Sequence, residues 1–248
     1  MELLSLILGL TIGSFLNVCI YRIPRGESIS FPPSHCTNCD NKIMWYDLIP
    51  VLSYIFLRGK CRHCKEKISI RYPIIELITG VLYGALYIEY GISFNLIKFI
   101  VLVSLVVVIG MIDFDTTDIY FSTTVTGIVL GIIFLSYNWY TGGEVLTYIY
   151  GAFLGGGLIA AIILLTHGMG WGDFELFLMV GLFLGFKLTL AALFFSFIFG
   201  GIIGIMLIIT KKKSRKDYIP FGPYIALSCI FVILFGERIL TLYLSAFY

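Results

Sequence analysis

The sequence predicts an all-α polytopic membrane protein with about eight transmembrane helices and a small cytoplasmic zinc-binding domain between the first two. Of its 248 residues, 59% are apolar and only 13% are charged, and the mean hydropathy is +0.97. Such values lie outside the range of water-soluble domains. The formal net charge of +2 is too small to indicate nucleic acid as a partner. The lipid bilayer is therefore the expected surroundings of most of the chain.

The expected helices follow from apolar runs, because a helix needs about 20 apolar residues to cross the hydrocarbon core. Uncharged runs occupy residues 3–21, 188–210 and 218–236. Four more runs, with a charged residue in or near one end, occupy 74–90, 97–112, 122–140 and 145–165. An eighth run, at 174–186, is shorter and rich in Phe and Gly.

The first run is predicted to be a retained helix rather than a signal peptide. No basic flank precedes it and no small-residue cleavage site follows it, whereas a signal peptide has both. The expected organisation is then a first transmembrane helix at 1–21, a four-cysteine zinc domain at 22–72, and a seven-helix membrane domain at 73–248 that carries the candidate catalytic site.

Basic residues orient the predicted bundle, since short cytoplasmic loops accumulate Lys and Arg. Segment 22–72 holds nine of the 17 basic residues, and the loop between the last two runs holds Lys211, Lys212, Lys213, Arg215 and Lys216. Both segments are therefore expected in the cytoplasm, and eight spans then place both termini outside. The same alternation brings the turns around Asp113 and Asp173 to the cytoplasmic side.

Segment 22–72 contains two CxxC pairs, Cys36 and Cys39 in "CTNC" and Cys61 and Cys64 in "CRHC". Four thiolates satisfy tetrahedral zinc and leave no open position, which predicts a structural metal site. Disulfides are the alternative, and the reducing cytosol disfavours them. A redox CxxC would need only one pair. His35 and His63 adjoin the pairs and are alternative ligands, but four cysteines suffice.

Two aspartates border apolar runs. Asp113 follows "VLVSLVVVIGMI" without interruption, and Asp173 begins the run at 174–186. A carboxylate at the hydrocarbon boundary costs about 2.5 to 3.5 kcal/mol, so it is expected to have a partner or a chemical role. Asp115 and Asp118, in the turn after Asp113, are interpreted as solvated loop residues.

Two carboxylates that meet in a low-dielectric site share one proton, as they do in an aspartic protease. One takes a proton from the attacking water, and the other donates a proton to the peptide carbonyl oxygen. Gly168, Gly170 and Gly172 precede Asp173, and residues without a side chain would let an extended substrate approach the acid. A flexible turn is the alternative explanation of these glycines.

The stretch "GMGWGD" resembles the GxGD signature of the type IV prepilin peptidases. The likeness continues through "GSFLNVCIYRIP", "CTNC", "DLIPVLSYIFLRGKCRHC", "ISIRYPIIE", the "ID" at Asp113 and "IPFGPY". The resemblance implies an intramembrane aspartic endopeptidase that cuts prepilins or pseudopilins after the glycine that ends a basic leader. It also implies methylation of the new amino terminus with S-adenosylmethionine, and it makes Asp113 and Asp173 the catalytic pair.

Two positions depart from this family's pattern. Members commonly have Pro-Asp shortly after the first catalytic aspartate, where this chain has "IYFS", and a lysine two residues after the second, where it has Glu175.

Two other functions remain as alternatives. One is an ion-coupled carrier with a zinc-binding cytoplasmic domain, although no acidic residue falls clearly in mid-span. The other is a noncatalytic assembly scaffold, which would not explain two buried acids.

Overall fold

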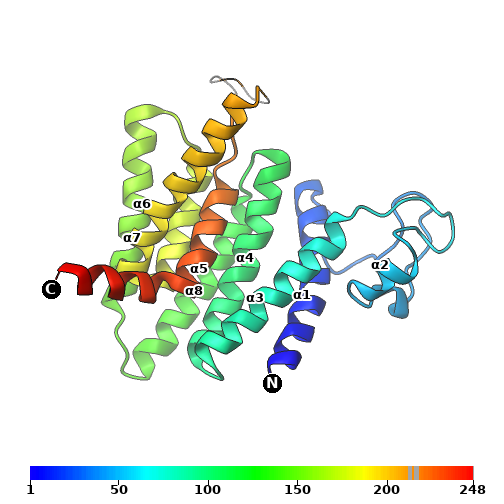
Figure 1. The fold of residues 1–248 in the computed structure, drawn as a ribbon, viewed down its shortest axis with the longest axis horizontal. Coiled ribbons are helices and arrows are strands. Elements are labelled where there is room, and N and C mark those ends of the chain that lie inside the picture. The colour runs from blue at the N-terminus through cyan, green and yellow to red at the C-terminus, as the bar shows by residue number, and fades with distance from the viewer. Residues whose placement is uncertain (212–213, 215–217, 248) are drawn as a thin grey trace. The chain divides into compact units, whose positions relative to one another are not determined.

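A computed structural model of the chain describes residues 1–211, 214 and 218–247, and the described residues are almost entirely helical (Figure 1). The chain divides into two compact units, Met1–Leu96 and Ile97–Tyr248. Of the basic residues used to orient the bundle, Lys212, Lys213, Arg215 and Lys216 lie outside the described residues.

The first unit is built on two antiparallel helices, α1 (Glu2–Arg22) and α3 (Arg71–Tyr90). Near one end of the pair, the Asn17 amide donates to the carbonyl of Tyr72 over 3.1 Å. Near the other end, the Ser5 hydroxyl donates to the carbonyl of Tyr83 over 2.9 Å. These two bonds fix the register of α3 on α1.

Glycines let the two helices touch between those bonds. A Cβ placed on Gly9 would lie 2.7 Å from the carbonyl oxygen of Thr79, and one on Gly13 would lie 2.8 Å from the Cα of Glu76. Small residues at such contacts are the usual means by which membrane helices pack closely. The segment between α1 and α3 carries only short helices, namely η1 (Ile23–Arg25), η2 (Trp45–Leu48) and α2 (Leu52–Phe56).

The second unit contains five helices: α4 (Phe94–Thr116), α5 (Phe121–Tyr140), α6 (Leu146–Thr166), α7 (Trp171–Ile209) and α8 (Gly222–Phe247). Among the described residues, six helices of the chain are long and apolar enough to cross a membrane: α1, α4, α5, α6, α7 and α8. Helix α3, which was expected to span as residues 74–90, is not among these six, and it carries Arg71, Glu76 and Glu89.

Helix α7 contains two of the predicted spans, 174–186 and 188–210, joined at a kink. Gly185 has the non-helical angles φ 76° and ψ 176°. In a straight helix, the N-cap Gly170 and Phe197 would be about 40 Å apart at 1.5 Å per residue. Yet Gly170 lies beside Tyr218, and the Phe197 ring is 5.3 Å from the ring of Phe221. The chain therefore turns back at Gly185, and the two halves correspond to the two predicted spans.

The first half of α7 packs against α6 through glycines on both helices. A Cβ on Gly151 would lie 2.8 Å from the carbonyl oxygen of Gly181, and one on Gly155 would lie 2.8 Å from that of Phe177. Gly157, on the same helix α6, is exposed and has no atom within 4 Å of the corresponding position. The close approach therefore belongs to one face of α6.

This contact predicts a difference between two alanine substitutions on α6. Gly151→Ala should lower the melting temperature of the purified protein, because overpacking a close contact costs about 1 to 3 kcal/mol. Gly157→Ala should leave it unchanged or slightly raised, since alanine favours a helix over glycine by about 1 kcal/mol. Both substitutions gain the same helix propensity, so the difference between the two melting temperatures measures the cost of the close contact at Gly151. Equal melting temperatures would contradict the packing.

Candidate active site and metal centre

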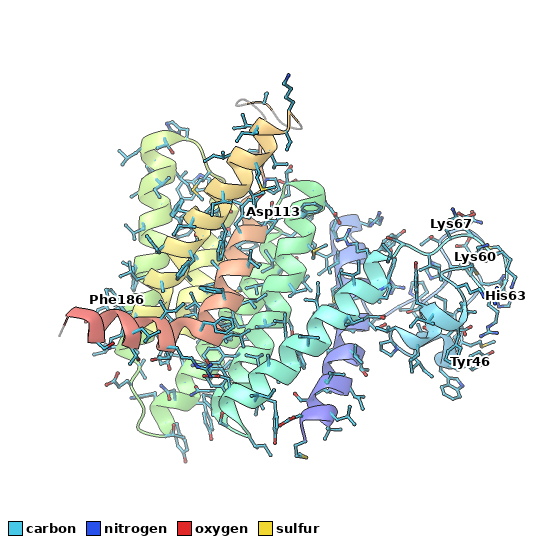
Figure 2. The ribbon with its side chains drawn as sticks, in the orientation of Figure 1. Tyr46, Lys60, His63, Lys67, Asp113 and Phe186 are labelled. Carbon is cyan, nitrogen blue, oxygen red and sulfur yellow. The ribbon has the colours of Figure 1, made fainter. Side chains whose placement is uncertain are left out.

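Asp113 lies in the last turn of α4, close to the start of α8 (Figure 2). Its side chain is 2% exposed, and its Oδ2 accepts a hydrogen bond of 2.7 Å from the backbone N–H of Gly222, the first residue of α8. A Cβ on Gly222 would lie 2.7 Å from the same oxygen. Only glycine therefore lets this amide reach the carboxylate without a shift.

Asp173 lies in the first turn of α7 and is 3% exposed. Its Oδ2 accepts a hydrogen bond of 3.2 Å from the N–H of Gly170, the N-cap of that helix. The amides at a helix N-terminus carry partial positive charge, which favours an anion there. Both aspartates thus meet the same kind of donor, a backbone amide at the start of a helix.

The carboxylates of Asp113 and Asp173 both lie close enough to the phenol of Tyr218 to act on it. Burial raises the pKa of Tyr218, and the negative charges of Asp173, Asp113 and Asp118 raise it further. The Tyr218 hydroxyl would lie 3.7 Å from a Cβ on Gly170, so it sits beside the turn that caps Asp173. The structure therefore brings the predicted pair to one end of the second unit.

The three glycines before Asp173 have different surroundings. Gly168 is exposed. A Cβ on Gly170 would make only ordinary contacts, whereas one on Gly172 would lie 2.6 Å from the Cβ of Ile119. The absence of a side chain at Gly172 therefore lets the start of α7 pack against the turn after α4. No such packing accounts for the missing side chain at Gly170, and at Gly168 a Cβ would meet only Thr166 of the same turn, at 3.3 Å.

Three other acidic residues, Asp115, Asp118 and Glu175, lie near the two aspartates in the sequence. Asp115 and Asp118 are exposed, as expected of a loop, but Asp118 is close enough to act on Tyr218. Glu175, at the position where the resemblance leads one to expect lysine, accepts a hydrogen bond of 2.6 Å from the hydroxyl of Thr124, a buried residue of α5. This bond gives Glu175 a packing role between α5 and α7.

Two residues of the site were not predicted, Gly222 and Tyr218. Both belong to the stretch that contains "IPFGPY", which was quoted only as part of a resemblance. A glycine beside two prolines at the start of an apolar run is a signal for a tight helix start. Nothing in the run itself indicates that the amide would face a carboxylate on α4.

The four predicted zinc ligands form a cluster in the first unit. The Sγ atoms of Cys36, Cys39, Cys61 and Cys64 all lie within 4.8 Å of one another. Cys36 and Cys64 are 3.8 Å apart, and Cys39 and Cys61 are 4.0 Å apart. Tetrahedral zinc with Zn–S bonds of about 2.3 Å requires sulfur atoms about 3.8 Å apart. Two pairs already have this spacing, and the cluster needs to close by no more than about 1 Å at its widest pair to hold a structural zinc ion.

Hydrogen bonds favour the thiolate form at one end of the cluster. The backbone N–H of Glu66 and then the Asn38 side chain stabilise the thiolate of Cys64 and lower its pKa to about 6. At Cys36, the backbone N–H of Asn38 lowers the pKa, but burial and the neighbouring thiols outweigh it and raise the pKa to about 11, as expected of crowded thiols that share protons. The Asn41 amide lies 3.5 Å from the Sγ of Cys39. The ring of His35 instead lies 3.1 Å from the carbonyl of Pro33. Donors directed at sulfur are typical of metal knuckles, because they neutralise ligand charge.

We expect about one zinc ion per chain by elemental analysis, because four thiolates fill one tetrahedral shell. Cys64→Ser should lower the zinc content and increase proteolysis within residues 22–72, since zinc binding here contributes to folding. His63→Ala is the matched control and should keep the metal. Full zinc occupancy after replacement of all four cysteines would refute the site.

Comparisons with known proteins agree with this geometry. Residues 100–205 match the type IV leader peptidase family, and residues 7–90 match the bacterial peptidase A24 N-terminal domain. A Bacillus subtilis (strain 168) protein named prepilin leader peptidase/N-methyltransferase is 35% identical over 96% of both chains. Proteins of the same name from Neisseria gonorrhoeae and Stutzerimonas stutzeri are 37% and 31% identical, over 91% and 98% of this chain and 87% and 93% of theirs. No solved structure matches the chain.

Proposed function

Because this chain belongs to the type IV leader peptidase family, we propose that it is a prepilin leader peptidase and N-methyltransferase. It is a multi-pass membrane protein that cleaves the leader from a prepilin and then methylates the new amino terminus. One observation carries the peptidase proposal: two buried carboxylates, Asp113 and Asp173, lie at the same end of the second unit. The names of the relatives support the second activity.

Asp113 and Asp173 act as an aspartic dyad that shares one proton. The ionised member takes a proton from a water molecule, whose oxygen bonds to the carbonyl carbon of the scissile peptide. The protonated member donates its proton to the carbonyl oxygen, which gives a tetrahedral diol. On collapse, the C–N bond breaks, the first carboxyl group protonates the departing amine, and the second regains a proton from the diol.

The backbone amides distinguish the two oxygens of each carboxylate, and so determine which oxygen transfers the proton. Gly222 and Gly170 each donate to the Oδ2 of their aspartate. We assign proton transfer to the Oδ1 atoms, because an oxygen that accepts a backbone amide is held in place and is a poorer base. The amides also stabilise negative charge in a site from which water is largely excluded. They position the dyad and take no proton themselves.

The substrate follows from the resemblance and from the site's location. It is a prepilin or pseudopilin whose basic leader ends in glycine, and the cut follows that glycine. The zinc domain and the dyad face the cytoplasm, with both termini outside, as the basic residues of segment 22–72 indicate. Zinc is structural in this account. S-adenosylmethionine is the methyl donor, and its binding residues are not assigned.

An ion-coupled carrier gains no support from the comparisons. Its geometry is also unfavourable, because both buried aspartates lie at one end of the second unit. A proton path across the bilayer would need acidic groups at other depths. A noncatalytic scaffold would have no use for a matched pair of buried carboxylates.

We predict that Asp113→Asn and Asp173→Asn each abolish cleavage of a prepilin while the protein remains folded and inserted in the membrane. Each substitution removes one half of the proton-sharing pair, and such losses are typically at least about 10⁴-fold. Asp115→Asn and Asp118→Asn are the controls and should keep most of the activity. Mass spectrometry of the peptide products measures the rate. Near-normal turnover in either of the first two variants would refute the dyad.

A further inference from the structure

The zinc domain exposes more apolar surface than a domain in water normally does. Among the exposed apolar side chains of η2, α2 and the residues that join them, six are called the platform: Trp45, Leu48, Ile49, Leu52, Ile55 and Phe56. Trp45 is 78% exposed and Phe56 is 81% exposed. Exposed apolar patches of this kind mark surfaces that bind a protein or a membrane.

The start of α2 is anchored level with the middle of α1. The backbone N–H of Val51 donates to the Oε2 of Glu76 over 2.8 Å, and Glu76 is level with Gly13 of α1. Gly13 lies about 13 Å along that helix from Arg22, at 1.5 Å per residue. Since α1 is long and apolar enough to span the bilayer, the start of α2 lies well below the basic end of α1.

The hydrogen bond from Val51 to Glu76 gives a backbone amide an acceptor within the protein. A backbone amide in hydrocarbon has no water to bind and therefore needs an acceptor from the protein. Val51 is the N-cap of α2, and the first amides of a helix have no acceptor within that helix. The buried carboxylate of Glu76 supplies one, which anchors α2 beside the first turns of α3.

A groove separates α2 from the outward face of α3. Its volume is about 520 Å³, and its walls include Tyr54 of α2 and Pro73, Ile74, Leu77 and Ile78 of α3. The three aliphatic side chains are each nearly half exposed. A groove with apolar walls at this depth matches a hydrocarbon chain.

Positive charge follows the platform in the sequence. Residues 58–71 contain a single acid, Glu66, and six bases: Arg58, Lys60, Arg62, Lys65, Lys67 and Arg71. Lys60 and Lys67 lie together in Figure 2, apart from Tyr46 of η2. Arg62 donates two hydrogen bonds, of 2.8 and 2.6 Å, to Asp47 and so ties the second zinc knuckle to η2. Basic residues beside a membrane segment attract anionic lipid headgroups.

We propose that the platform is a membrane-inserted surface whose partner is an anionic phospholipid. The platform side chains lie among the acyl chains, one acyl chain fills the groove between α2 and α3, and the basic residues of 58–71 other than Arg62 contact the headgroups. The zinc site then holds the platform at the bilayer surface. This interaction does not depend on the peptidase reaction.

Tryptophan fluorescence tests the insertion in the full chain, in nanodiscs of phosphatidylcholine and phosphatidylglycerol. Trp139→Phe with Trp171→Phe leaves Trp45 as the sole tryptophan. Its emission should lose most of its intensity to lipids brominated on the acyl chains and little to aqueous iodide. The control adds Trp45→Phe and His63→Trp, which moves the probe to an exposed zinc knuckle, and should show the reverse order. Zinc content verifies that both variants are folded.

Two results would overturn the insertion. One is a Trp45 that iodide quenches and brominated lipid does not. The other is protection of Trp45 that arises only when a prepilin peptide is added, which would make the platform a peptide-binding surface.

Native mass spectrometry tests the groove. The unmutated protein should retain phosphatidylglycerol after transfer to detergent, and Leu77→Trp, which fills the groove, should lose most of it. Val129→Trp is the control, since Val129 is half exposed on α5. No retained lipid in the unmutated protein, or equal loss in both variants, would remove the groove from the proposal.

Discussion

The structure of the second unit depends on the cost of burying two carboxylates away from water. An unpaired polar group in a low-dielectric interior is expensive, and a carboxylate is more so. The protein meets this cost with backbone amides at two helix starts, Gly222 for Asp113 and Gly170 for Asp173. The start of α8 must therefore lie close to the end of α4, and Asp173 must lie in the first turn of its own helix, α7.

The reversal of α7 is the clearest consequence. If α7 continued straight from Asp173, its far end would lie across the membrane, and α8 could not begin beside Asp113. The turn at Gly185 brings the chain back, so the end of α7 and the start of α8 lie at the same end of the second unit. Close packing of α6 on α7 through Gly151 and Gly181 supports the first, shorter half. Glycine is therefore needed both at the turn, Gly185, and at the contact between α6 and α7.

Much of this was predictable from residues alone. Apolar runs located the helices, because hydrocarbon imposes a length on every span. The spacing of the two CxxC pairs identified four cysteines that the fold brings within ligand distance. Asp113 and Asp173 stood out because a carboxylate next to an uninterrupted apolar run is costly. Each of these signals reflects a local physical constraint.

The rest depends on contacts between distant segments, for which a single sequence carries no local signal. Gly222 is selected by a carboxylate on another helix, and Gly172 by Ile119. The level of the start of α2 depends on Glu76 and Gly13. The short helix α2 was not predicted either, because its apolar residues resemble those of a buried segment, whereas the structure exposes them.

The central claim is that Asp113 and Asp173 act together on one peptide bond. Its most direct test is the affinity of a prepilin peptide whose scissile bond is replaced by a hydroxyl-bearing, non-cleavable analogue of the tetrahedral diol. Calorimetry in nanodiscs should show tight binding to the unmutated protein and a loss of at least about 100-fold with Asp113→Asn and with Asp173→Asn, because transition-state analogues bind the intact catalytic pair. Unchanged affinity in either variant would contradict the account.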